Sequence, residues 1–279
     1  MSNVTISAGD VNKLRQLTGA GMMDCKKALT ETGGDFEAAV DWLRKKGQKV
    51  SEKRADQEVN EGVAIAQVNP DATIGVVLAV GCETDFVAKN DNYIQFAQSI
   101  ADLALNNQPA DKDALLTLPL GDVTVAEAIA EQTGKIGEKI EITEYSLIEA
   151  ASVTPYNHSN GKVSVLVGMN KSGDAVVETA KDVTMQIAAM SPIAIDKDDV
   201  PEEVKQREME IGKEQARAEG KPEQILEKIA AGKLEAYFRD NTLLNQKFVK
   251  DNSKSIKDVL AGVDKELKVT AFKRIGLGS

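Results

Sequence analysis

The side chains that could do covalent chemistry in this sequence are few. His158 is its one histidine, and Cys25 and Cys82 are its two cysteines. Cys82 and His158 could act as a nucleophile and its base, but no other signature of a thiol enzyme accompanies them. His158 lies in a turn-like segment, which favours an ordinary surface histidine. A structural zinc site needs four nitrogen or sulfur ligands, so these three residues predict no metal site.

Motifs that bind phosphate or nucleotides are also missing from the sequence. It has no GxxxxGK[S/T] loop, no GxGxxG motif behind a predicted strand and no HExxH motif. In those patterns, glycine-rich backbone cradles phosphate or paired histidines hold zinc. We therefore predict that the chain is not an enzyme, with no catalytic residues and no cofactor-binding site of its own.

Two short segments are better suited to contact another protein. In the first, Met22 and Met23 directly follow a Gly-Ala-Gly turn. Methionine is flexible and adapts to irregular contacts, so this pair could dock on a helix of a partner. Filling the core of its own module explains the pair equally well, and the pattern alone does not choose.

The second segment is residues 82–89, where a predicted strand ends and a helix begins. Thr84 suits the N-cap of that helix and Asp85 its first turn, because acidic side chains are favoured near a helix N-terminus. This arrangement would place Phe86 at the exposed tip of a sheet. Aromatic residues make up 4% of the chain, so Phe86 could anchor an interface, although the pattern alone favours core packing.

The overall composition limits the class of partner. The net charge is −10 and the pI near 4.9, whereas a protein that neutralises nucleic-acid phosphates is expected to be basic. No apolar run approaches the roughly 18 residues of a membrane span, and residues 1–5 lack the pattern of a secretory signal. We therefore predict a cytoplasmic protein whose partners are proteins, without direct binding to nucleic acid or membrane.

The first of these segments belongs to a predicted helical module at residues 1–47. Its first helix follows a capping box formed by Ser7 and Asp10 and ends at a glycine-rich turn. The third helix begins after Asp35, and we expect it to end at Gly47. The segment at 48–60 is polar and charged, which is typical of a linker, part of which could be helical.

Beyond residue 60 the pattern becomes that of an α+β protein with small antiparallel sheets. The first core subdomain, residues 61–148, predicts a hairpin, an amphipathic helix, a helix capped by Thr124 and Glu127, and a returning strand. The apolar run at 163–169 and the helix after it repeat the hairpin-then-helix order. This weak repeat is compatible with two similar subdomains.

The second core subdomain is predicted to be discontinuous in sequence. Its first part covers residues 149–197, and its second part, with a final strand, covers 237–279. Between them, residues 198–236 are highly charged and punctuated by Pro201 and Gly220. This pattern predicts a projecting antiparallel helical hairpin that is available to a partner.

Two sequence signatures resemble those of a known family. The sequence LRQLTGAGMMDCKKAL at residues 14–29 closely resembles the N-terminal signature of the elongation factor Ts family, and CETDFVAK at 82–89 resembles its second signature. Further similarity extends over almost the whole chain, in residues 134–139, 156–167, 220–222, 227–229 and 243–251. Ala79, Gly81 and Lys247 depart from the family pattern, but none of them removes the Thr-Asp-Phe sequence of the second signature.

The resemblance implies a guanine nucleotide exchange factor for the translational GTPase elongation factor Tu, in its GDP-bound and nucleotide-free forms. It implies a ubiquitin-associated-like N-terminal module, a two-part α+β core and an inserted helical hairpin. The hairpin is then also a candidate surface for dimerisation of the complex.

Residue roles follow from the same resemblance. A wedge near the magnesium site of the GTPase would be formed by Thr84, Asp85, Phe86 and Val87. Docking on a helix of the GTPase domain would involve Leu14, Met22, Met23 and Val249. His158 would lie on the second core subdomain, in the part that faces the third domain of the GTPase.

Two other functional classes stay open at this point. A scaffold protein that uses the charged hairpin would bind a partner without accelerating nucleotide release. A Cys82 enzyme would instead lose its turnover in a Cys82→Ser variant.

Overall fold

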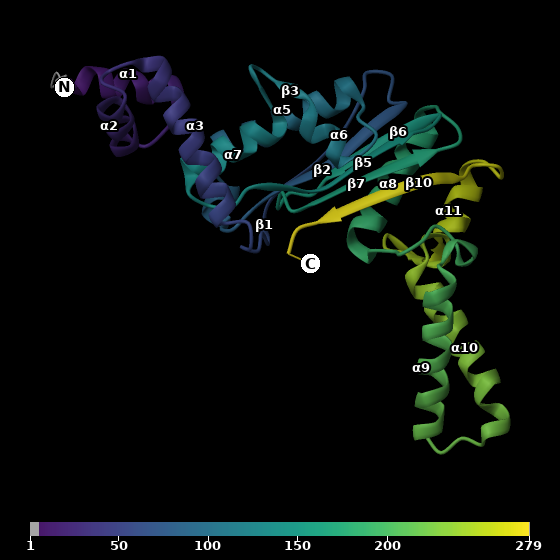
Figure 1. Ribbon diagram of the computed structural model, residues 1–279. Helices are drawn as coiled ribbons and strands as arrows, with labels where there is room; N and C mark the ends of the chain where they lie inside the picture. Colours follow the sequence, from purple (N-terminus) through teal and green to yellow (C-terminus); the bar gives the residue numbers. More distant parts are fainter. Residues whose placement is uncertain (1–5, 279) are drawn as a thin grey trace.

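The computed structural model describes residues 6–278, and Figure 1 shows an N-terminal helical module, a central pair of sheets and a projecting helical hairpin. The prediction made for residues 1–5 lies outside this range. The fold is α+β with small antiparallel sheets, as predicted.

The N-terminal module consists of α1 (Ala8–Thr18), α2 (Met22–Glu31) and α3 (Phe36–Lys53). The predicted capping box forms, with the Ser7 hydroxyl oxygen accepting from the Asp10 amide and the Asp10 carboxylate accepting from the Ser7 amide. Gly19 ends α1 in the left-handed region at φ +69°, which glycine adopts without steric cost. Leu14, Cys25 and Leu29 are fully buried between the three helices.

The third helix is longer than the sequence suggested. Gly47 was expected to end it, but α3 continues to Lys53 and Gly47 is buried inside it. A side chain at this point would press on α7 (Val125–Ile136), because a Cβ on Gly47 would lie 3.1 Å from the Ala130 carbonyl oxygen. The glycine therefore allows a close helix crossing instead of providing a stop signal.

The first core subdomain contains a three-stranded sheet in the order β1-β2-β5. The strands are β1 (Glu61–Val68), β2 (Ile74–Cys82) and β5 (Glu141–Glu149), and the other elements are α4 (Asp85–Ala88), α5 (Asp91–Asn107), α6 (Lys112–Thr117), β3 (Pro119–Leu120), β4 (Val123–Thr124) and α7. The predicted Thr124–Glu127 capping box forms at the start of α7.

The second core subdomain repeats this topology. Its sheet has the order β10-β7-β6, so in both sheets a hairpin is followed by a helix and then by a strand that pairs with the second hairpin strand. The elements are β6 (Ser152–Asn157), β7 (Val163–Met169), α8 (Asp174–Met190), η1 (Lys197–Asp199), η2 (Leu243–Asn245), β8 (Lys247–Phe248), β9 (Asp251–Ser255), α11 (Ile256–Val263) and β10 (Val269–Gly276).

The two sheets pack face to face, with α5 outside the first and α8 outside the second (Figure 1). Alternate residues of β2 point to opposite faces of the first sheet. Leu78 packs toward α5, whereas Val77 and Ala79 pack with Leu166 of the other sheet. Because both faces of β2 are buried, its sequence is a nearly continuous apolar run.

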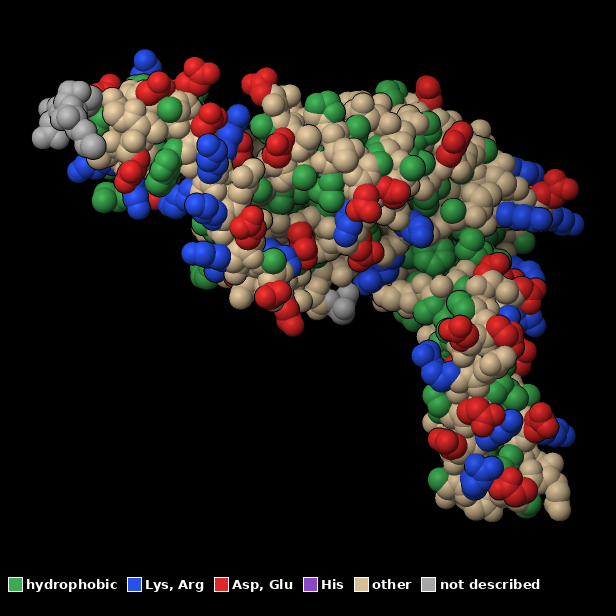
Figure 2. Space-filling view, viewed as in Figure 1, with side chains coloured by type: hydrophobic (Ala, Val, Ile, Leu, Met, Phe, Trp, Pro, Cys, Tyr) green, Lys and Arg blue, Asp and Glu red, His purple; other side chains and the backbone are tan. Residues whose placement is uncertain are grey.

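The hairpin consists of α9 (Glu202–Ala218) and α10 (Glu223–Asn241), which project from the core. The two helices approach closely at Gly212, where a Cβ would lie 3.0 Å from the Ala230 Cα. Figure 2 shows acidic and basic side chains interspersed over its surface. No helix within residues 6–278 is both long and apolar enough to cross a membrane.

Candidate partner-binding surface

Phe86 is the most exposed large apolar side chain of the described chain, at 84%. It lies in α4, a single helical turn that follows directly after β2. Its neighbour Val87 is partly buried against the core of the first subdomain. We call residues 84–87 the wedge. Exposure of a phenylalanine to water is unfavourable, so the structure favours an interface anchor over core packing.

Thr84 occupies the N-cap position of α4, but its side chain does not cap the helix as the sequence suggested. Its hydroxyl instead donates to the Glu138 carboxylate at 2.7 Å, and its amide N–H donates to the same carboxylate at 3.0 Å. Glu138 follows α7, so a residue distant in sequence fixes the start of the wedge. Local sequence rules could not find this pair, because it depends on the tertiary fold.

Glu83 precedes the wedge and is held from two sides. The Arg54 guanidinium donates to both carboxylate oxygens at 3.0 and 3.1 Å, and the Lys139 amide N–H donates to one of them at 2.5 Å. Two-point, charge-assisted hydrogen bonds of this kind fix orientation as well as position. The base of the wedge is therefore pre-organised while Phe86 itself remains exposed.

Asp85 forms an ion pair with Lys89, with 2.6 Å between the carboxylate oxygen and Nζ. This hydrogen bond and the charge of Lys89 lower the pKa of the Asp85 carboxyl. Both side chains are substantially exposed, so the pair is available to rearrange when a partner approaches.

Cys82 does not have the environment of a catalytic nucleophile. Its side chain is fully buried, its thiol donates to the Thr84 carbonyl oxygen, and burial raises its pKa to about 11. A reactive cysteine instead needs a lowered pKa and some exposure. The structure therefore gives the thiol-enzyme alternative no support.

His158 is exposed in the turn between β6 and β7, where its Nδ1 lies 2.8 Å from the Tyr156 hydroxyl. This turn is attached to the first subdomain. The Ala64 amide donates to the Gly161 carbonyl oxygen at 2.8 Å, and Lys162 forms an ion pair with Glu61 at 2.6 Å. Because Glu61 lies opposite Cys82 in the sheet, the turn and the wedge occupy the same end of the core.

A second apolar surface lies on the N-terminal module. Leu17, Met22 and Met23 are exposed by 69%, 55% and 74%. They lie on either side of the Gly19–Gly21 turn, at the end of α1 and the start of α2. We call these three residues the module patch. Leu17 was missed in the sequence, although its position three residues after the buried Leu14 marks it as the edge of the apolar stripe.

Comparison with known proteins decides the family. The sequence model described as "Elongation factor TS" matches residues 83–279. A protein named elongation factor Ts from Cytophaga hutchinsonii is 55% identical to this chain, over 98% of this chain and 99% of its own length. Another of that name, from Porphyromonas gingivalis, is 42% identical, over 99% of this chain and 100% of its own length. The chain belongs to the elongation factor Ts family. A relative from Christiangramia forsetii is 51% identical over 98% of this chain and 99% of its own.

Membership of the elongation factor Ts family supports a role in nucleotide exchange during translation elongation. It confirms the resemblance seen in the two signatures. A member of this family is a nucleotide exchange factor and not a catalytic enzyme in the usual sense.

Two of the residues predicted to dock with Met22 and Met23 are not part of the module patch in this structure. Leu14 has no exposed surface, so it supports the module from inside and cannot contact a partner directly. Val249 is 44% exposed but follows β8 beside α11, at the opposite end of the molecule from α2 (Figure 1). Its amide donates to buried Gln186 of α8 at 2.9 Å, so it belongs to a separate surface.

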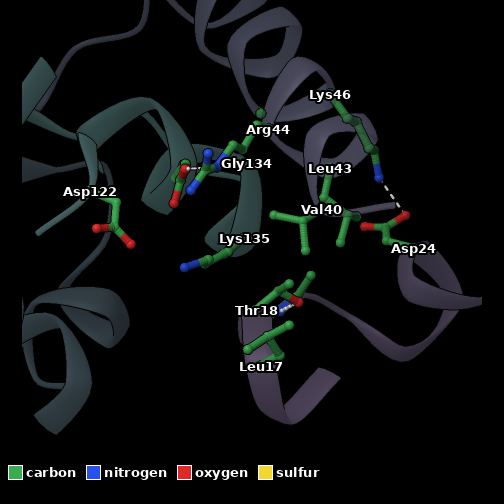
Figure 3. A pocket seen from close by; sticks show the side chains of 13 residues that line it. Leu17, Thr18, Asp24, Val40, Leu43, Arg44, Lys46, Asp122, Gly134 and Lys135 are labelled. Atoms are coloured by element: carbon green, nitrogen blue, oxygen red, sulfur yellow. Dashed lines mark hydrogen bonds and ion pairs between the residues drawn. The ribbon is translucent and has the colours of Figure 1, made fainter. Parts of the chain in front are cut away.

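A cleft of about 310 Å³ lies between the module and α7, beside the point where the two are in contact. Figure 3 shows Leu17, Val40 and Leu43 around it, with Lys135 entering from α7. Ion pairs flank the cleft, Asp24 with Lys46 and Arg44 with Glu131. The module therefore meets the core through a joint that is only partly filled.

Proposed function

We propose that this chain is a guanine nucleotide exchange factor that binds elongation factor Tu·GDP and promotes release of GDP during translation elongation. In this proposal, the wedge displaces Mg²⁺ from the nucleotide and distorts the phosphate site. The observation that carries the proposal is the 84% exposure of Phe86 on a pre-organised base.

The mechanism is one of linked binding. A GTPase holds Mg²⁺ against the phosphates of its nucleotide, so displacing the ion removes a major attraction. The factor weakens nucleotide binding, and the nucleotide weakens factor binding by the same amount. A thousandfold weakening corresponds to about 4 kcal/mol. One buried aromatic anchor contributes about 2 kcal/mol or more, so further surfaces must hold the distorted GTPase.

The module patch and the turn that carries His158 are the proposed further surfaces. Met22 and Met23 dock on a helix of the GTPase domain of elongation factor Tu. His158 faces the third domain of the same GTPase. Val249 provides a separate contact on the second subdomain, and the hairpin is a surface through which the complex could dimerise. The two free, buried cysteines suit a reducing cytoplasm, where we place this activity.

The proposed function is tested by the release of a fluorescent GDP analogue from elongation factor Tu. We expect strong acceleration by the unaltered chain and a loss of most of it in Phe86→Ala. Met190→Ala is the matched control, because it removes another exposed apolar side chain, 46% exposed at the C-terminal end of α8. Circular dichroism checks that both variants are folded.

The other outcomes separate the alternatives. Acceleration retained in Phe86→Ala would move the mechanism from the wedge to the docking surfaces. Binding without any acceleration by the unaltered chain would contradict the exchange function and favour a scaffold that uses the hairpin.

A further inference from the structure

Three segments distant in sequence meet at the Glu83 carboxylate. Arg54 lies at the C-terminal end of α3, Glu83 directly precedes the wedge, and Lys139 follows α7. The Glu83 and Arg54 side chains are 16% and 34% exposed, so their ion pair is partly shielded from water. A shielded two-point pair is more rigid than the solvated ion pairs of a surface.

The linker is held at the same place. Lys139 Nζ donates to the Gln57 carbonyl oxygen at 2.9 Å and lies 3.4 Å from the Glu141 carboxylate. Lys139 therefore contacts Glu83, at the base of the wedge, through its backbone amide, and it contacts the linker through its side chain. The chain between α3 and β1 is therefore attached to the base of the wedge at Arg54 and at Gln57.

Helix α7 connects the same two parts a second time. The module packs on α7 where Gly47 crosses Gly134, and Arg44 pairs with Glu131 at 2.9 Å. The residue pair that follows α7, Glu138 and Lys139, then holds Thr84 and Glu83. A rotation of the module about α7 must therefore strain or break the contacts at the base of the wedge.

We propose that Arg54 and Glu83 are positioning residues that couple docking of the N-terminal module to seating of the wedge. The inference rests on the proposed function, because both surfaces must contact the same GTPase. Once the module patch is docked, the rigid connection presents Phe86 at a fixed place, and its insertion becomes effectively intramolecular. Without the ion pair, only the connection through α7 holds the two surfaces in register, and part of this advantage is lost.

The first test uses the free protein and does not depend on a GTPase. Amide hydrogen exchange is compared in the unaltered chain, Arg54→Met and Glu83→Gln. We expect the Thr84 and Lys139 amides to exchange at least about threefold faster in both variants, because local opening becomes easier. Lys53→Met is the matched control, since it removes a neighbouring exposed cation for which no ion pair exists within residues 6–278. Unchanged exchange in Arg54→Met would overturn the proposal.

The second test measures coupling in the GDP-release assay. Met23→Ala, Phe86→Ala and their combination are compared in the unaltered chain and in Arg54→Met. Coupled contacts predict that the combined loss in kcat/KM is at least about threefold smaller than the product of the single losses. In the Arg54→Met background, where the connection through α7 remains, the combined loss should lie closer to that product.

The outcomes distinguish this inference from the function on which it rests. The same coupling in both backgrounds, or none in the unaltered chain, would overturn the positioning role even if Phe86→Ala abolishes exchange. If neither single variant alters GDP release, the proposed function fails, and hydrogen exchange still decides whether Arg54 and Glu83 hold the wedge. A purely structural role would raise amide exchange throughout the first subdomain, beyond the two amides at the base of the wedge.

Discussion

Gly47 of α3 packs directly on Gly134 of α7, and a Cβ on Gly134 would overlap the Cα of Gly47. The module is joined to the core by two helices whose backbones touch. Neither glycine lies in a turn or has a positive φ. The close approach of the two helices therefore explains why glycine occurs at both positions. The distance between the two helix axes is therefore set at this crossing.

A methyl group at this crossing should separate the module from the core. We expect Gly134→Ala to lower the free energy of unfolding by about 1–3 kcal/mol, because the helices must move apart, and to reduce GDP release by displacing the module patch. Gly232→Ala in α10 is the control, since no atom lies within 4 Å of its Cβ position. Urea unfolding should show a slight gain for that control. Equal behaviour of the two variants would contradict the crossing argument.

Removal of the Glu138 carboxylate should loosen the wedge without changing the module. Glu138→Ala leaves the Thr84 amide and hydroxyl without their acceptor, which costs about 1–2 kcal/mol for partly buried groups. We expect kcat/KM for GDP release to fall about 5- to 30-fold. Glu144→Ala removes an exposed carboxylate from β5 and should have little effect. A similar loss in both variants would point to net charge instead of the Thr84 contact.

Much of the architecture could be predicted because local rules determine it. Residue spacing alone was enough to recognise two capping boxes, Ser7 with Asp10 and Thr124 with Glu127, and the apolar run of β2. The base of the wedge was not, because Glu138 lies 54 residues from Thr84 along the chain. Such a pair depends on how α7 returns to the sheet, which no local pattern encodes.

Other differences between the sequence-based expectations and the fold have physical causes as well. Gly47 has the sequence context of a helix stop, but its lack of a side chain serves a helix crossing that is visible in the fold. Leu14 belongs to the first signature because it fills the module core, and membership of a signature does not distinguish buried residues from exposed ones. The exposure of Phe86 likewise follows from the fold, because a phenylalanine at this spacing also fits a core.

Leu14 and Leu17 should respond to alanine in opposite ways. Leu14 is fully buried, so Leu14→Ala should destabilise the protein by about 2–5 kcal/mol. Leu17 is 69% exposed, so Leu17→Ala should change stability by at most about 0.5 kcal/mol but weaken binding to the GTPase. Thermal unfolding and a titration of elongation factor Tu test the two effects. Normal binding by Leu17→Ala would remove it from the module patch.

Stability should fall in alkaline solution because of Cys82. Burial raises the pKa of its thiol from 9.0 to about 11, so the unfolded chain loses this proton at lower pH than the folded one. The stabilising contribution is fully present below about pH 9 and is lost as pH rises to about 11. At about 1.4 kcal/mol for each unit, the loss is at most about 3 kcal/mol.

A comparison with Cys82→Ala tests the Cys82 thiol together with its effect on Tyr93. The Tyr93 hydroxyl is buried too, and burial raises its pKa, as does the neighbouring Cys82. Tyr93 therefore contributes alkaline destabilisation of the same sign in both proteins, and a smaller amount in the variant. Cys82→Ala should be less stable near neutral pH because it leaves a small cavity. Urea unfolding at about pH 8 and about pH 10.5 should then show a smaller loss for the variant than for the unaltered chain. An equal loss of unfolding free energy in the two proteins would mean that the Cys82 thiol ionises equally easily in the folded and the unfolded chain. Its burial would then not resist loss of the proton.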